Sequence, residues 1–161
     1  MNATAAIKAI LEADATLEGM IQFLPGDTRT DYIYTKPLTR LLSPTAFQKP
    51  TVDTLWPSLY IASAAPVRHP QDYKIPYMTV IYPHVWCYIP TLEGIEYEEK
   101  ARLILQRVRV LIHDIQVIDP DTGLSGRLAW FGDTAGREAD EYTKVWAESS
   151  MYEYRARWRD E

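Results

Sequence analysis

The chain has 161 residues, which is the size of one domain, so residues 1–161 are predicted to form a single domain. Its 47% apolar and 24% charged residues are typical of a globular protein and exclude a disordered chain or a fibre. A net charge of −5 disfavours a general nucleic-acid binder. The single cysteine, Cys87, excludes an internal disulfide and a cysteine cluster for zinc.

The chain contains no apolar run of membrane-spanning length and begins without the pattern of an export signal, so we expect a soluble protein with no membrane contact. Its aromatic content is more unusual, because eleven tyrosines and five tryptophans accompany only three phenylalanines. Tyr and Trp combine a large ring with a polar group, which suits surfaces that a partner buries. The composition therefore favours an assembling protein.

Two short helices are predicted at the start of the chain. Ile7, Ile10 and Leu11 recur at helical spacing, which indicates an amphipathic helix over residues 3–13. Asp14 is placed to cap a second short helix over residues 15–20.

Residues 27–57 lose this periodicity, and four prolines at intervals exclude long helices and central strands there. Loops of this length inside a compact domain are usually functional or disordered. Large apolar and aromatic side chains argue against a solvated linker, and we single out Tyr32, Tyr34, Leu41, Phe47 and Trp56. We therefore expect a Pro-rich arm that packs on a neighbouring subunit or a tail partner.

Strands are predicted over residues 58–67 and 77–89, where apolar and aromatic side chains alternate. Pro83 interrupts the second strand and indicates a bulge, an edge position or two consecutive short strands. After the long helix described next, we expect a strand over residues 127–133, a polar loop over 133–140 and a long final strand over 144–159. In that last strand Trp146, Tyr152 and Tyr154 share one parity.

The clearest periodicity lies in residues 91–115, which predict one long amphipathic helix. Its apolar side includes Ile104, Val108 and Leu111, which we expect to face the sheet. Four glutamates crowd its first turns, where the helix dipole favours anions. Helices interspersed with strands in this order predict an α+β fold.

No segment carries a recognisable chemical motif. The seven glycines form no nucleotide-binding pattern, and no catalytic motif surrounds Cys87 or the histidines. Residues 119–125 offer alternate oxygen ligands for a cation, but Trp130 stands where a calcium loop needs its glutamate. We therefore expect no catalytic, metal or cofactor site.

A basic row ends the chain. Arg155, Arg157 and Arg159 alternate along the final strand, so they share one face of the sheet. Such a row either is simply solvated or meets an acidic protein or phosphate.

Residues 5–17 read AAIKAILEADATL, an Ala/Leu-rich helix that runs into an Ala-Asp-Ala-x-Leu segment. This stretch resembles the opening of the tail terminator, or tail completion, proteins of long-tailed bacteriophages. The elements that follow are similar to the same family. They are a strand with a Pro-Tyr start at Pro76, one long helix, and a final strand that ends in Tyr-Arg-Ala-Arg-Trp.

The resemblance implies a mixed, largely antiparallel sheet, with a short N-terminal helix and one long helix packed on one face. It also implies a non-enzymatic protein that forms a hexameric ring, caps the phage tail tube, ends its polymerisation and joins the tail to the head. The implied partners are further copies of the chain, the major tail tube protein and a head-neck connector protein. DNA would pass through the lumen without specific binding, and the ring would reside in the virion tail or neck after assembly in the host cytoplasm.

The candidate assembly interface comprises the arm residues and the basic row, namely Tyr32, Tyr34, Leu41, Phe47, Trp56, Arg155, Arg157 and Arg159. Two alternatives stay open. One is another phage neck or head-tail joining protein, and the other is a small hydrolase that uses Cys87.

Overall fold

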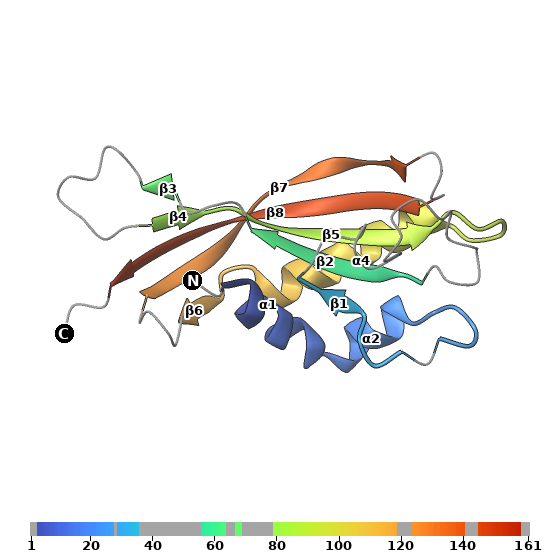
Figure 1. Cartoon of the computed structure of the whole chain (residues 1–161), viewed down its shortest axis with the longest axis horizontal. Coiled ribbons are helices and arrows are strands. Elements are labelled where there is room, and N and C mark those ends of the chain that lie inside the picture. Colours follow the sequence, from blue (N-terminus) through green and yellow to red (C-terminus); the bar gives the residue numbers. More distant parts are fainter. Residues whose placement is uncertain are drawn as a thin grey trace, which may run out of the picture.

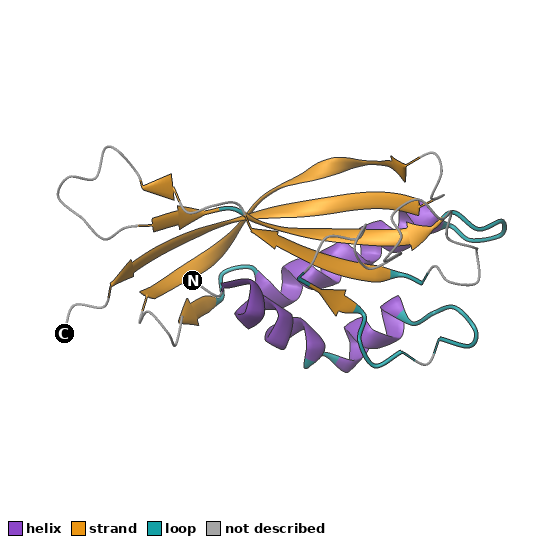
Figure 2. Cartoon of the chain, viewed as in Figure 1, coloured by secondary structure: helices purple, strands orange, loops and turns teal. Residues whose placement is uncertain are grey.

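A computed structural model describes residues 3–27, 29–35, 56–63, 67–68, 79–118, 124–140 and 145–158. Within these residues an eight-stranded sheet carries three helices on one side (Figures 1 and 2). The predicted α+β class is confirmed, whereas residues 36–55 of the predicted arm lie outside the described residues. The elements are α1 (Ala3–Glu12), α2 (Ala15–Ile21), β1 (Ile33–Tyr34), β2 (Ser58–Ser63), β3 (Val67–Arg68), β4 (Thr79–Ile81), β5 (Pro83–Pro90), α4 (Tyr97–Ile112), β6 (Gln116–Ile118), β7 (Leu124–Asp140) and β8 (Val145–Trp158).

Strand β8 lies at the centre of the sheet. β4 and β5 pair with one edge of β8 in a single register, since Ile81 is opposite Tyr154 and His84 is opposite Met151. β7 pairs with the other edge of β8 along nearly its whole length. β2 adds to β5, and β1 runs parallel to β2, while the other described pairings are antiparallel. The sheet is therefore mixed and largely antiparallel.

Pro83 divides the predicted strand 77–89 into two short strands that lie end to end. It is the first residue of β5, a position where a missing backbone N–H is tolerated, and only Tyr82 separates it from β4. Of the predicted strand over 58–67, the described residues lie in β2 and at the start of β3. In the pairing of β2 with β5, Ser63 is opposite Pro83. In the pairing of β3 with β4, Val67 is opposite Val80, so the register is shifted by one residue between the two pairs.

The predicted polar loop over residues 133–140 is wrong, because β7 continues without a break to Asp140. Three register irregularities accommodate this part of β7 against β8, between Trp130 and Gly132, between Thr134 and Arg137, and between Glu138 and Asp140. Polar side chains replace the alternating apolar pattern that marks a half-buried strand. Two of them bond to β8, where Asp133 accepts from the Ser150 hydroxyl and Thr134 pairs with the Ser149 hydroxyl, both at 2.6 Å.

Gly126 allows β7 to approach β8 closely. A Cβ at this position would lie 2.1 Å from the carbonyl oxygen of Arg155 and 2.7 Å from the Tyr154 ring. The Tyr154 hydroxyl then donates to the Val117 carbonyl at 3.0 Å. This bond reaches beneath β7 and connects β6 to the central strand.

The core lies between the helices and one side of the sheet. Leu59 and Ile61 of β2 and Val85, Cys87 and Ile89 of β5 alternate inward and are buried, as period-two strands require. Helix α4 covers them with an apolar stripe that confirms the sequence prediction, although Leu111 and Tyr97 are only partly buried at its margin. The buried members of that stripe are Ala101, Ile104, Leu105, Val108 and Ile112.

Asp14 joins the two N-terminal helices to α4. Its carboxylate accepts from the backbone N–H of Leu17 at 2.9 Å, which caps α2 as predicted. The same carboxylate receives two hydrogen bonds from the Arg107 guanidinium, at 2.8 and 2.9 Å. The hydrogen bonds from Arg107 hold the pKa of Asp14 below its ordinary value. None of the helices in the described ranges is long and apolar enough to cross a membrane.

The neighbouring residues Ile104 and Leu103 test the packing of α4. We expect Ile104→Ala to lower the free energy of unfolding by about 2–5 kcal/mol, because this side chain is 1% exposed. Leu103 is 47% exposed on the outer side of α4, and Leu103→Ala should change stability by less than about 0.5 kcal/mol. Urea unfolding of both variants measures the difference, and equal losses would contradict the assigned orientation of the helix.

Asp14→Asn tests the ion pair with Arg107, because asparagine keeps the cap and removes the charge. A carboxyl group with a lowered folded-state pKa stabilises the fold above its ordinary value of 3.8 and loses this contribution as the pH falls toward the folded value. Wild-type stability should therefore fall more steeply than that of Asp14→Asn as the pH drops below 3.8. Urea unfolding across this range measures both curves, and parallel curves would refute the contribution.

Candidate assembly surface

Arg29 joins the two ends of the predicted arm, Asp27 and Pro57, which are called the base of the arm. Its guanidinium binds the Asp27 carboxylate through two nitrogens, each at 2.9 Å. It also donates to the Pro57 carbonyl at 2.6 Å and to the Ser58 hydroxyl at 3.0 Å. Burial acts to raise the pKa of Asp27, but the bonds and charge of Arg29 outweigh it and the pKa is lowered. The two ends of residues 27–57 are thereby fixed side by side.

Three of the predicted interface residues lie near the base of the arm, at the β1 edge of the sheet. Tyr32 is buried in the hydrophobic core, which raises the pKa of its hydroxyl. Tyr34 is partly exposed, and its hydroxyl donates to the Asp31 carbonyl at 2.7 Å. Trp56 is also partly exposed and lies 5.8 Å from the Arg29 guanidinium. Leu41, Phe47 and Arg159 lie outside the described residues.

The basic row is partly assembled at the other end of the molecule. Arg155 is exposed on β8 directly opposite Arg127 of β7, and Arg157 is opposite Ser125. Like charges opposite each other on a sheet repel, and acidic neighbours offset this here. Arg155 pairs with Glu153, and Arg127 pairs with Asp114 at 3.2 Å. The sequence does not indicate that Arg127 belongs to this basic cluster, because the register of β7 against β8 cannot be inferred from its position in the chain.

The side of the sheet that has no described helix, called the open side, carries aromatic rings. Trp86 and Tyr88 stack with ring centroids 6.2 Å apart, and Tyr60 is opposite Trp86 on β2. Small residues of β8 stand beside these rings, with Ser149 opposite Trp86 and Ala147 opposite Tyr88. The alternation of β5 is the sequence signal for this surface, because its even positions share one side.

A second pair of aromatic residues, Trp130 and Phe131 of β7, is exposed. Sequence reasoning assigned both to an ordinary strand and singled out neither. The available signal was the run of two large aromatics directly before Gly132 and Asp133.

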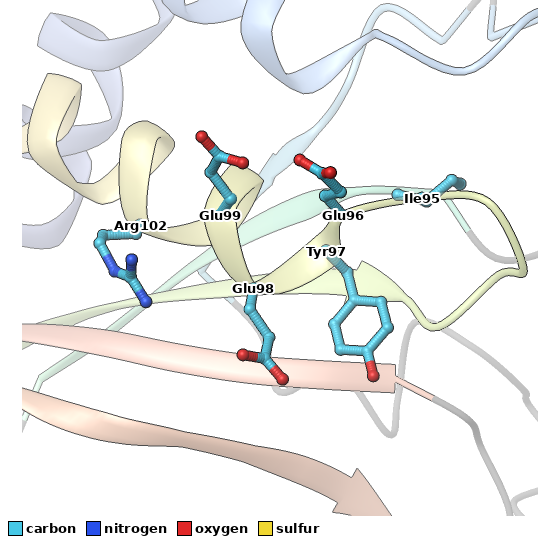
Figure 3. Close-up of a pocket in the computed structure, with 6 residues that line it drawn as sticks. All are labelled: Ile95, Glu96, Tyr97, Glu98, Glu99 and Arg102. Atoms are coloured by element: carbon cyan, nitrogen blue, oxygen red, sulfur yellow. The ribbon is translucent and has the colours of Figure 1, made fainter.

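An open pocket of about 470 Å³ lies at the start of α4 (Figure 3). Glu96 and Glu99 line one side of it, and Glu98 and Tyr97 point the other way, toward the sheet. A hydrogen bond shared with Glu99 raises the pKa of Glu96. Helix α4 begins at Tyr97, later than the predicted residue 91, so only Glu98 and Glu99 of the four glutamates lie in its first turn. Together with Glu96 they give the pocket an acidic lining.

Cys87 and His84 are the two described residues of β5 that the sequence offers as reactive groups. Cys87 is buried, and burial together with the charge of Glu148 raises the pKa of its thiol, which opposes formation of a thiolate nucleophile. Burial lowers the pKa of His84. Among the described residues, no group of three or more His, Cys, Asp or Glu side chains is placed to hold a metal ion.

Comparisons with known proteins support the fold. No protein-family model matches the chain. No curated protein matches it either. A chain of a solved structure described as "Virion of native gene transfer agent (GTA) particle" has the same fold, with a TM-score of 0.59 and 13% identity. The match covers 98% of this chain and 99% of that chain, so the two share their fold over essentially their full lengths.

The buried position of Cys87 predicts an inert thiol. A thiol reagent such as DTNB should leave the native protein unmodified at neutral pH and react fully once urea has unfolded it. Cys87→Ser should lower stability by about 1–3 kcal/mol and leave assembly intact. Rapid labelling of the folded protein, or a folded serine variant that cannot assemble, would restore the hydrolase alternative.

Proposed function

We propose that the chain is a structural protein of a phage-like virion and that it acts as a tail terminator. The observation that carries this proposal is the fold shared over the full length with a chain of a gene transfer agent virion. The Ala-Asp-Ala-x-Leu opening and the order of elements agree with the tail terminator family. A buried thiol and exposed aromatic surfaces also fit a protein that works by contact.

In this role, six copies form a ring that caps the tail tube, ends its polymerisation and provides the surface that joins the tail to the head. Its partners are further copies, the major tail tube protein and a head-neck connector protein. The ring resides in the tail or neck of the virion after assembly in the host cytoplasm. The net charge of −5 suits a lumen that DNA crosses without binding, because like charges suppress phosphate contacts.

The contact surface of this proposal combines both ends of the sheet. Tyr34 and Trp56 offer partly exposed rings beside the fixed base of residues 27–57, and Arg155 is exposed at the opposite end. Tyr32, next to β1, is buried in the core and so offers no exposed ring to this surface. Leu41, Phe47, Arg157 and Arg159 complete the proposed surface.

Negative-stain microscopy of the purified protein with tubes of the major tail protein tests the function. We expect a six-fold ring at one end of each tube, and tubes that stop lengthening when the protein is added during polymerisation. Binding to isolated head connectors with no effect on tubes would favour another neck protein. Failure of the protein to bind tubes or connectors would refute the role in the virion.

A further inference from the structure

We propose that an aromatic row on the open side of the sheet is the docking site for residues 36–55 of the same chain. The aromatic row consists of Tyr34, Tyr60, Trp86 and Tyr88. The segment that it receives is the central part of the predicted Pro-rich arm. This contact lies within one chain, so it goes beyond the proposed role in the virion and does not depend on it.

Strand register aligns the rings of the aromatic row. Tyr34 of β1 is opposite Tyr60 of β2, and Tyr60 is opposite Trp86 of β5. These three strands lie side by side in the sheet (Figure 1). Side chains directly opposite each other share one side of a sheet and lie about 5 Å apart, so the rings form one surface. Trp86 also stacks on Tyr88, with 15° between the ring planes.

The aromatic row faces away from the helices and is partly exposed. Along β5, the buried residues Val85 and Cys87 of the core alternate with the partly exposed Trp86 and Tyr88. Tyr60 is likewise partly exposed on β2. A contiguous aromatic surface of this kind marks an interaction site, because apolar surface prefers to leave water.

Both ends of residues 36–55 lie beside this row. β1 ends at Tyr34, and β2 begins at Ser58, which is directly opposite Tyr88. Arg29 fixes the second end by donating to the Ser58 hydroxyl at 3.0 Å. At roughly 3.3 Å per residue, a segment of this length reaches about 30 Å from its base even when it must return to it. The whole row is therefore within reach.

The composition of the segment matches an aromatic surface. It contains three prolines, Pro37, Pro44 and Pro50, together with the large apolar residues Leu41 and Phe47. Pro-rich segments bind aromatic-lined surfaces in peptide-recognition domains, because proline packs well on aromatic rings and loses little conformational freedom on binding. Tyr hydroxyls and the Trp N–H can also bond to the backbone of such a segment. The chemistry of the row therefore selects a Pro-rich occupant.

Attachment at both ends selects the segment of the same chain over a segment from another molecule. A group tethered beside its binding site has an effective concentration on the order of mM. It also binds without the loss of translational and rotational freedom that association of two molecules costs. A second copy reaches the row only at its concentration in solution. Residues 36–55 of the same chain are therefore the favoured occupant.

Trypsin cleavage at one bond tests this contact. Arg40–Leu41 is the one bond of residues 36–55 that trypsin cuts, because a proline follows both lysines of the segment. We expect Trp86→Thr to speed this cleavage at least about tenfold, since cleavage follows the population in which the segment is released. Threonine removes the ring and still favours a strand. Mass spectrometry measures cleavage at this bond.

Phe131→Thr is the matched control, because it removes an exposed aromatic ring of the sheet that lies outside the aromatic row. This variant should be cut at Arg40 at the wild-type rate. Cleavage after Lys74, which lies between β3 and β4 in the chain, is the internal reference and should be unchanged in both variants. Circular dichroism establishes whether each variant is folded.

A nitroxide label gives a second measurement that leaves the row intact. Ala46→Cys provides the attachment site, whereas Cys87 is buried. The label should attenuate the indole N–H resonance of Trp86 more strongly than that of Trp130, whose ring lies against Arg109 of α4 on the helix side. Isotope-labelled protein without the nitroxide, mixed with nitroxide-labelled protein, should show no attenuation, because the contact is within one chain.

The remaining outcomes overturn the contact. Equal cleavage of the wild type and Trp86→Thr, an equal effect in Phe131→Thr, or stronger attenuation of Trp130 would each do so. Protection of Arg40 that is lost on dilution would assign the row to a second copy, and protection that appears only with tail tubes would assign the segment to the tube. If Trp86→Thr does not fold, the nitroxide measurement decides. All these experiments use the isolated chain, so their failure leaves the test of tail termination unaffected.

Discussion

The structure depends on the register of β8, the strand against which both halves of the sheet align. β4 and β5 occupy one edge of β8 in a single register although Pro83 separates them, and β7 occupies the other edge. This register places Tyr152 and Tyr154 beneath the helices. It also determines which polar residues of β7 meet the serines of β8. The position of Trp130 and Phe131 at the surface follows from the same alignment.

Two arginines of α4 connect the helical layer to the rest of the domain in opposite directions. Arg107 reaches Asp14 and so orients α1 and α2, whereas Arg109 reaches Asp133 and supports the Trp130 ring. Because both pairs are hydrogen-bonded and charged, they fix direction more strictly than apolar packing does. The helix thereby connects the β1 side of the domain with the β7 side.

The proposed function follows from surfaces and from no single reactive group. Cys87 is enclosed by the core, and the exposed features are aromatic rings, the acidic pocket beside Glu96 and the arginine pairs of β7 and β8. A protein that terminates a polymer needs such surfaces, because its role is to bind its partners in one geometry. The likeness to a virion chain at 13% identity shows that the fold is shared by two chains of very different sequence.

The sequence by itself determined the elements whose signals are local. Helical spacing predicted α1 and α4, Asp14 predicted the cap of α2, and alternation predicted β5 and the common side of Tyr152 and Tyr154 in β8. Tertiary structure alone decided what depends on pairing between distant residues. The continuation of β7 through residues 133–140 is one example, since Asp133 and Thr134 of this segment bond to the serines of β8 while its sequence shows no apolar alternation. The approach of Arg127 to Arg155 and the bulge at Phe131 are others, because strand register is set by contacts between residues far apart in the chain.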